Sequence, residues 1–199
     1  MTGIFGLLMV IKAQSQMLWH FPKLVFFVSD GGCMSGEQEV IGGELSAENG
    51  RIVVKLERNI GHSPAKVWEM LTGSEELALW LAPGKLDARI GGRVQLDFGN
   101  SGTPIDCRVT RCEPHRILAY SWSSGDAPER PLVWELEPTD EGTRLVLTLS
   151  LPDNELVPIA CAGWDSHLEM LMAALEGINI HFPVERFRVA RSWFETQVR

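Results

Sequence analysis

Leucine occupies every second position of Thr-Arg-Leu-Val-Leu-Thr-Leu-Ser-Leu, residues 143–151. This period of two is typical of a strand with one apolar face, because successive side chains of a strand point to opposite sides of the sheet. An apolar sheet face needs a cover. The cover is predicted a few residues later, in Gly-Trp-Asp-Ser-His-Leu-Glu-Met-Leu-Met-Ala-Ala-Leu-Glu-Gly, residues 163–177.

In this second segment apolar side chains recur at spacings of four, three and four, which predicts an amphipathic helix that ends at Gly177. The apolar stripe consists of Trp164, Leu168, Leu171 and Leu175. The opposite, solvent-facing side is expected to carry Asp165, Glu169 and Glu176. A second helical stretch is expected from Pro183 to about residue 198, with an apolar side made of Val184, Phe187, Ala190 and Phe194.

Upstream, the pattern predicts one strand over residues 52–57 and then two short helices, which begin at Ser63-Pro64 and Ser74 and end before Pro83-Gly84. Five more strands are expected before residue 143, at residues 86–90, 93–98, 105–112, 117–122 and 132–137. Gly91-Gly92 is predicted to form a two-residue hairpin. The short connections predict antiparallel neighbours, so the fold class is α+β, with an antiparallel sheet of about seven strands under a long C-terminal helix.

Composition describes an ordinary globular chain: 199 residues, 45% hydrophobic and 22% charged, with a net charge of −8. These values exclude a disordered chain, collagen and a disulfide-dense miniprotein. The sequence pI of about 5.1 argues against nucleic acid as a partner, because neutralising phosphates needs a basic surface. The apolar runs at residues 3–11 and 24–28 are too short to span a bilayer.

The N-terminal region differs from the rest. Residues 1–33 have a net charge of +1 and no periodicity, so residues 1–49 are expected to be a poorly ordered extension, or one that is in part untranslated if synthesis starts at Met34. Residues 50–199 are the expected domain. The four cysteines, Cys33, Cys107, Cys112 and Cys161, form no CxxC pair, and we expect them to be reduced in a cytoplasmic protein.

Several short strings, in order over residues 50–199, resemble the START-like or SRPBCC superfamily. Within it the chain is similar to the domain of the activator of the ninety-kilodalton heat-shock protein's ATPase, which is common in bacteria as a stand-alone protein. The strings that carry the resemblance are Ser63-Pro64-Ala65-Lys66-Val67-Trp68, Leu79-Trp80-Leu81-Ala82-Pro83-Gly84, Gly91-Gly92-Arg93, Gly163-Trp164, His167-Leu168 and Leu175-Glu176-Gly177. The resemblance implies a helix-grip fold, in which a curved sheet wraps around the C-terminal helix with a cavity between them.

No cofactor or metal is expected, because the nucleotide-binding, zinc-protease and esterase motifs are missing and His167-Leu168-Glu169 lacks the downstream cysteines of a zinc deaminase. Glu135 and Glu137 share a strand face that we expect to be solvated. Cys112 and His115 lie close in sequence, but they lack a third group to orient them as a nucleophile and base.

Aromatic content is the remaining functional signal, with seven Trp against one Tyr. Core packing explains many of these side chains, and the functional alternative is that they line a pocket for a flat or hydrophobic ligand. The candidate pocket residues are Trp80, Phe98, Tyr120, Trp122, Trp134, Leu147, Trp164, His167, Leu168 and Leu171. His167 is either a helix-edge histidine bonded to backbone or water, or a group that orients a ligand or moves a proton.

The resemblance, taken together with these residues, implies three alternative functions. The chain is expected to be a monomer or homodimer that binds a hydrophobic small molecule without catalysing a reaction. An enzyme with cyclase-like or hydrolase-like activity that uses His167 is the second hypothesis. A co-chaperone or protein-interaction module, with a contact to a chaperone, is the third.

Overall fold

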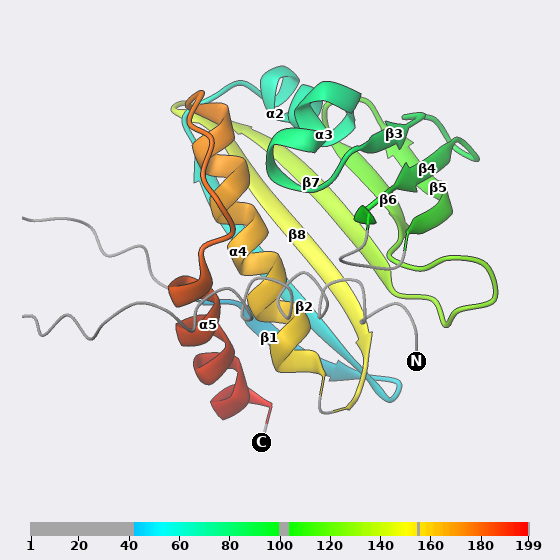
Figure 1. Ribbon diagram of the computed structural model, residues 1–199, viewed down its shortest axis with the longest axis vertical. Helices are drawn as coiled ribbons and strands as arrows, with labels where there is room; N and C mark the ends of the chain where they lie inside the picture. The colour runs from blue at the N-terminus through cyan, green and yellow to red at the C-terminus, as the bar shows by residue number, and fades with distance from the viewer. Residues whose placement is uncertain (1–41, 100–103, 155, 199) are drawn as a thin grey trace, which may run out of the picture.

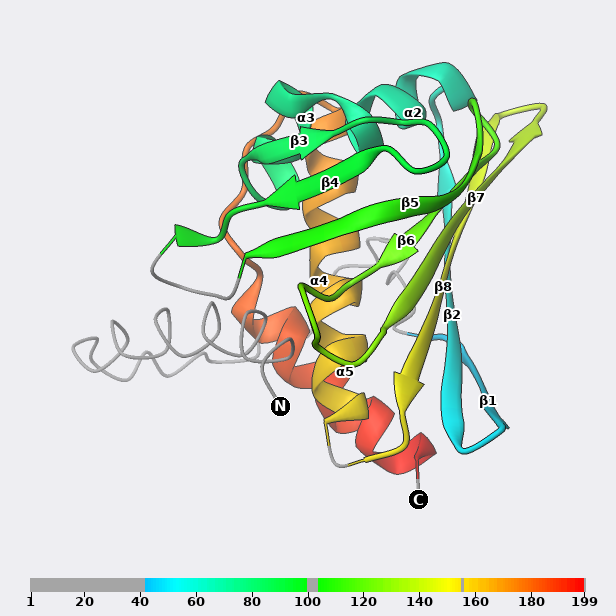
Figure 2. The ribbon, with the colours of Figure 1, turned by 90° about the vertical axis from the view of Figure 1, so that its right-hand side faces the viewer.

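The computed structural model describes residues 42–99, 104–154 and 156–198, in which a curved antiparallel sheet wraps around one long helix (Figures 1 and 2). Eight strands form the sheet in the order β1-β2-β8-β7-β6-β5-β4-β3. The elements are β1 (Glu44–Glu48), β2 (Arg51–Ile60), α2 (Pro64–Thr72), α3 (Ser74–Trp80), β3 (Gly84–Leu86), β4 (Arg93–Leu96), β5 (Ile105–Glu113), β6 (Ile117–Ser121), β7 (Pro131–Thr139), β8 (Gly142–Pro152), α4 (Val157–Leu175) and α5 (Val184–Gln197). The expected α+β helix-grip architecture is confirmed.

Strand β8 organises the sheet. It pairs with β2 on one side and β7 on the other, and its four alternating leucines are buried as expected. These leucines belong to the same buried core as the apolar residues of α4. Helix α4 crosses the inner face of the sheet, while α2 and α3 close one end (Figure 1). Gly177 follows α4 with a φ of +73°, a left-handed conformation that glycine adopts without steric cost.

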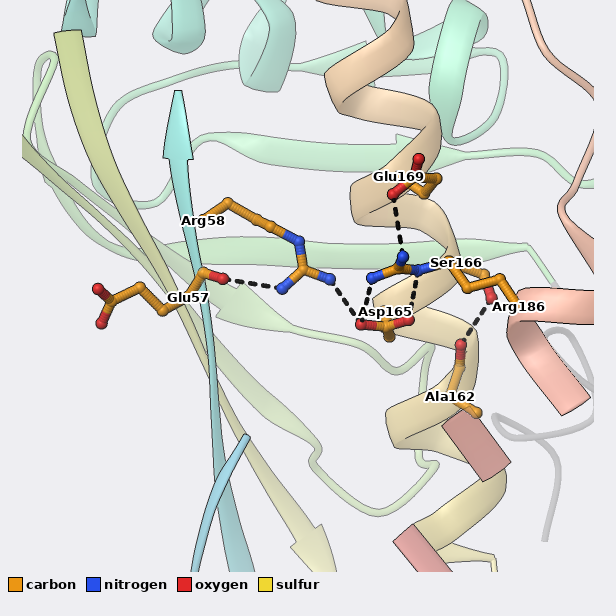
Figure 3. A network of polar contacts seen from close by, with 7 residues as sticks. All are labelled: Glu57, Arg58, Ala162, Asp165, Ser166, Glu169 and Arg186. Carbon is orange, nitrogen blue, oxygen red and sulfur yellow. Dashed lines mark hydrogen bonds and ion pairs between the residues drawn. The ribbon is translucent and has the colours of Figure 1, made fainter. Parts of the chain in front are cut away.

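The polar side of α4 differs from the expectation. Asp165 does not face solvent: it is 0% exposed, because α5 packs beside α4 and covers this part of the helix. Its carboxylate accepts hydrogen bonds from Arg58 of β2 (2.5 Å to Oδ1) and from Arg186 of α5 (2.8 Å to Oδ2), as Figure 3 shows. Arg186 also pairs with the half-buried Glu169, while Glu176 remains exposed. One buried carboxylate therefore joins the sheet to both C-terminal helices.

Strand β1 was not expected, since it lies inside residues 1–49. It pairs with β2 through a turn at Asn49-Gly50, where φ is +51° and +72°. Asn-Gly is the dipeptide that two-residue hairpins favour, so the sequence did carry a signal for this strand. Residues 1–41, including Met34 and Cys33, lie outside the described part of the chain.

The predicted two-residue hairpin at Gly91-Gly92 is wrong. Strand β3 ends at Leu86, and residues 87–92 form the connection to β4. Gly91 donates its N–H to the carbonyl of Val109 and Gly92 accepts from the N–H of Val109, at 2.8 and 2.9 Å. The two glycines thus pair with β5, beside the register shift that β5 makes between Val109 and Arg111, instead of turning the chain back at once.

Replacing Asp165 by alanine is expected to lower the free energy of unfolding by about 3–5 kcal/mol, because it leaves two arginines buried without their carboxylate. The control is Glu195→Ala, which removes an exposed pair with Arg191 on α5 and is expected to cost less than about 1 kcal/mol. Urea unfolding of the two variants measures the difference, and equal midpoints would contradict the role given to Asp165.

Candidate functional site

The candidate site is the layer of side chains between the inner face of the sheet and α4. The structure brings nine of the ten predicted pocket residues into this layer as buried side chains, and it places Phe98 half-buried at the edge. Trp80 ends α3, Phe98 follows β4, Tyr120 lies in β6 and Trp122 just after it, Trp134 lies in β7, Leu147 in β8, and Trp164, His167, Leu168 and Leu171 lie on α4.

The aromatic rings of this layer form one connected series, here called the aromatic series: Phe98, Trp122, Trp164, Trp134 and Trp80. Ring centroids are 5.7 Å apart for Phe98 and Trp122, 4.7 Å for Trp122 and Trp164, 5.7 Å for Trp164 and Trp134, and 6.0 Å for Trp134 and Trp80. Each contact is edge-to-face, the arrangement that the quadrupoles of aromatic rings favour. The series therefore runs from the half-buried Phe98 to the end of α3.

The layer is packed. The nine buried candidates expose 5% of their surface or less, which is typical of a close-packed protein interior. Trp134 donates a long hydrogen bond of 3.5 Å to the hydroxyl of Tyr120, and burial raises the pKa of that phenol. The rings fill the space between sheet and helix in the structure as it stands.

His167 is the polar residue inside this layer, and it is 3% exposed. Its Nδ1 lies 3.0 Å from the carbonyl oxygen of Trp80, so Nδ1 must carry the proton and Nε2 presents a lone pair. No group among the described residues bonds to Nε2. The ring sits edge-on between Trp164 and Phe182, with centroid distances of 6.2 and 5.5 Å. Burial lowers the pKa of His167 to about 4, and the bond to Trp80 opposes this shift.

Arg130 is a second polar side chain of the layer, and the sequence analysis did not select it. It is 6% exposed, and its Nε and Nη1 have no partner in the described part of the chain. The signal was present in the strand period: Arg130 precedes β7 at the same parity as the inward-facing Leu132 and Trp134. A charged residue at an inward-facing position of the strand pattern could therefore have identified Arg130 from the sequence.

The three cysteines in the described part of the chain do not form a nucleophilic site. Burial raises the pKa of Cys107 to about 11 and of Cys161 to about 12, and it also raises that of Cys112, which disfavours a thiolate. The Cys112 thiol lies 3.1 Å from the carbonyl of Ala88, whereas the His115 ring stands edge-on to Trp68. The structure therefore gives each of the two side chains its own partner.

The other face of the sheet holds a shallow charged depression of about 510 Å³ near β1, β2, β7 and β8. Arg144 lies there between Glu57 (2.6 Å) and Glu137 (3.0 Å), and its hydrogen bond lowers the pKa of Glu57. Glu135 and Glu137 are exposed, as expected. Exposed ion pairs of this kind are typical of a solvated sheet face.

No group of three or more His, Cys, Asp or Glu side chains in residues 42–99, 104–154 and 156–198 is arranged to hold a metal ion. Within the same residues, no helix has both the length and the apolar character that crossing a membrane requires.

Comparison with known proteins gives a family and a set of similar structures. The family model described as "Activator of Hsp90 ATPase homolog 1-like protein" matches residues 61–176. No curated protein matches the sequence significantly. A conserved protein of unknown function from Enterococcus faecalis, EF2215, is similar in structure, with a TM-score of 0.66 at 20% identity over 80% of this chain and 93% of its own.

Two further structures are similar over most of their own length. CalU16 from Micromonospora echinospora has a TM-score of 0.62 at 22% identity, over 79% of this chain and 98% of its own. Protein MLL2253 from Mesorhizobium loti has a TM-score of 0.57 at 27% identity, over 64% of this chain and 99% of its own.

The buried His167 predicts an acid-sensitive stability. Since its pKa in the folded protein is about 4 and the ordinary value is 6.5, the unfolded chain binds the proton more readily. Stability is full above pH 6.5 and falls as the pH drops towards 4, by about 3 kcal/mol from this group. Urea unfolding from pH 7 to 4 is expected to show a smaller loss in His167→Gln than in the wild type. The control His181→Gln replaces an exposed histidine, and a variant His167→Gln with the wild-type slope would contradict the prediction.

Proposed function

The chain belongs to the family of activator of Hsp90 ATPase homolog 1-like proteins, within the SRPBCC superfamily, and on this premise we propose that it binds a hydrophobic small molecule between its sheet and α4. The observation that carries the proposal is the aromatic series. It continues without a break from the half-buried Phe98 to the centre of the layer. Pockets for small apolar ligands are built mainly from such aromatic surfaces with a few polar groups.

Ligand entry is proposed at the Phe98 end of the series. Phe98 is the member that reaches the surface, and its contact with Trp122 is one aromatic pair. Separating such a pair costs roughly 0.5–1.5 kcal/mol beyond the area that it buries. A flat apolar ligand that inserts between the rings replaces this contact with two similar ones, so the packed layer and a binding role are compatible.

His167 supports the proposal as a polar group at the inner part of the layer. Its Nε2 lone pair is buried without a partner among the described residues, and an unsatisfied buried acceptor costs about 1–3 kcal/mol. A ligand hydroxyl that reaches Nε2 would satisfy it. We further propose that the protein acts in the cytoplasm, since Cys107, Cys112 and Cys161 are free thiols.

The ligand proposal is tested with the full chain by titration of tryptophan emission and by native mass spectrometry, using a panel of lipids, flavonoids and polyketides. A retained adduct and a saturable change in emission are expected. Trp122→Leu is expected to weaken binding by about tenfold, because it removes an aromatic face worth roughly 1 kcal/mol together with its contact area. Trp193→Leu on α5, outside the series, is the matched control. Constant emission across the panel at high concentration would remove the main support for a pocket.

The enzyme hypothesis has one specific observation in its favour, the unprotonated Nε2 of His167 among apolar rings. In that case His167→Ala is expected to abolish turnover of a bound ligand, whereas a binding protein is expected to keep its ligand affinity within about tenfold. A steady-state assay on whichever panel member binds, run beside its titration, measures both. Unchanged turnover in His167→Ala would exclude His167 as the catalytic group.

A further inference from the structure

Arg130 is an unusual residue for the inner face of a sheet. Its position follows from strand pairing: the N–H of Trp122 donates to the carbonyl of Arg130 at 2.8 Å, one pair beyond Ser121 and Pro131. Residues directly opposite in an antiparallel pair place their side chains on the same face. Arg130 therefore shares the inner face with Trp122, at the Phe98 end of the aromatic series.

The charge of Arg130 is not paired with a carboxylate of residues 42–99, 104–154 or 156–198. Its buried Nε and Nη1 lack any hydrogen-bond partner there. Asp126 and Glu129 belong to the same connection between β6 and β7, yet both are exposed. Buried arginines are normally paired, as Arg58 and Arg186 are with Asp165 in this chain.

A second arginine strengthens the positive field at this place. Arg51 donates to the carbonyl of Glu129 at 3.1 Å, next to Arg130 in sequence, and to Ser150 at 2.7 Å. Burial lowers the pKa of Arg130, and the nearby charge of Arg51 lowers it further. An anion would relieve both conditions, because it supplies the hydrogen-bond acceptors and the negative charge that the described residues do not give Arg130.

We propose that Arg130 binds the carboxylate of an amphipathic organic acid whose apolar part lies against Phe98, Trp122 and Trp164. This inference rests on the proposed function and adds the ligand's chemical class. The planar guanidinium matches a carboxylate, while the neighbouring rings match an alkyl or aryl group. In this orientation the apolar part of the ligand follows the aromatic series towards the interior. The carboxylate lies at the other end, where Phe98 reaches the surface.

The test compares acids with matched neutral molecules on the full chain. The probes are decanoate against 1-decanol, naphthalene-2-carboxylate against naphthalene-2-methanol, and acetate as the acid without an apolar part. Titration calorimetry and tryptophan emission give the affinities for the wild type, Arg130→Gln and Arg130→Lys. The control is Arg116→Gln, which removes an exposed arginine in the turn between β5 and β6 and changes the net charge equally.

The wild type and Arg116→Gln are expected to bind the two apolar acids about tenfold or more tightly than the alcohols, which corresponds to a hydrogen-bonded charge pair. Arg130→Gln is expected to lose this preference while keeping its affinity for the alcohols, and Arg130→Lys to retain part of it. Near-ultraviolet circular dichroism verifies that the variants are folded. Because the change removes an uncompensated buried charge, the unliganded Arg130→Gln protein is expected to melt no lower than the wild type.

The possible results distinguish a failure of the role given to Arg130 from a failure of the hydrophobic pocket. Equal affinities for acids and alcohols in the wild type, or an unchanged acid preference in Arg130→Gln, overturn the role of Arg130 and leave hydrophobic binding intact. Acetate bound as tightly as decanoate, with loss of both in Arg130→Gln, supports the anion site and overturns the hydrophobic pocket. A wild type that binds none of the probes overturns both.

Discussion

The burial of Asp165 is the constraint on which the arrangement of the molecule depends. A carboxylate that is 0% exposed is tolerated only with close positive partners, and here these come from β2 and α5. Because Arg58 and Arg186 approach from opposite sides, α4 is held between the sheet and the last helix (Figure 3). The rotation of α4 about its axis is then restricted, and this restriction directs Trp164 towards the tryptophans of the sheet.

The layer under α4 combines two kinds of local environment. Its rings and leucines are packed to near-zero exposure, as in any core, while His167 and Arg130 bring polar atoms that the described residues do not satisfy. Natural cores rarely retain such groups, because each one costs stability. Buried polar groups without hydrogen-bond partners concentrate at functional sites. His167 lies beside Trp164, and Arg130 lies opposite Trp122. The rings therefore supply the apolar surface of the proposed ligand site, and the two polar side chains supply its hydrogen-bonding groups.

Family membership supports the fold of this chain but not the identity of a ligand. Membership gives the helix-grip architecture, and the similar structures below 25% identity support the fold alone. The proposals about ligand class therefore depend on residues of this chain. Arg130 in particular is identified by its burial and by the two guanidinium nitrogens that have no partner among the described residues. Its position at the Phe98 end of the series indicates where the polar end of a ligand would lie.

Much of the fold could be predicted because its signals are local. The leucine alternation of residues 143–151 and the helical spacing around Trp164 depend only on the geometry of a strand and a helix, so β8 and α4 appear where the pattern indicates. The same holds for nine of the candidate pocket residues, which are inward-facing by periodicity. The two-residue hairpin predicted at Gly91-Gly92 is wrong because two glycines can adopt several backbone conformations. The hydrogen bonds to Val109 of β5 decide which one forms.

The sequence by itself determined which side chains are apolar, where the strands and helices lie, and thus which face of the sheet needs a cover. Only the tertiary structure decided which polar residues are buried with partners and which without them. Asp165 was expected on the solvent side and is buried, since α5 returns along α4. Arg130 is the opposite case, because its local sequence does not predict that it is buried without a carboxylate partner among the described residues. Pairing between charges depends on distances between segments far apart in the chain, and such distances exist only once the chain has folded.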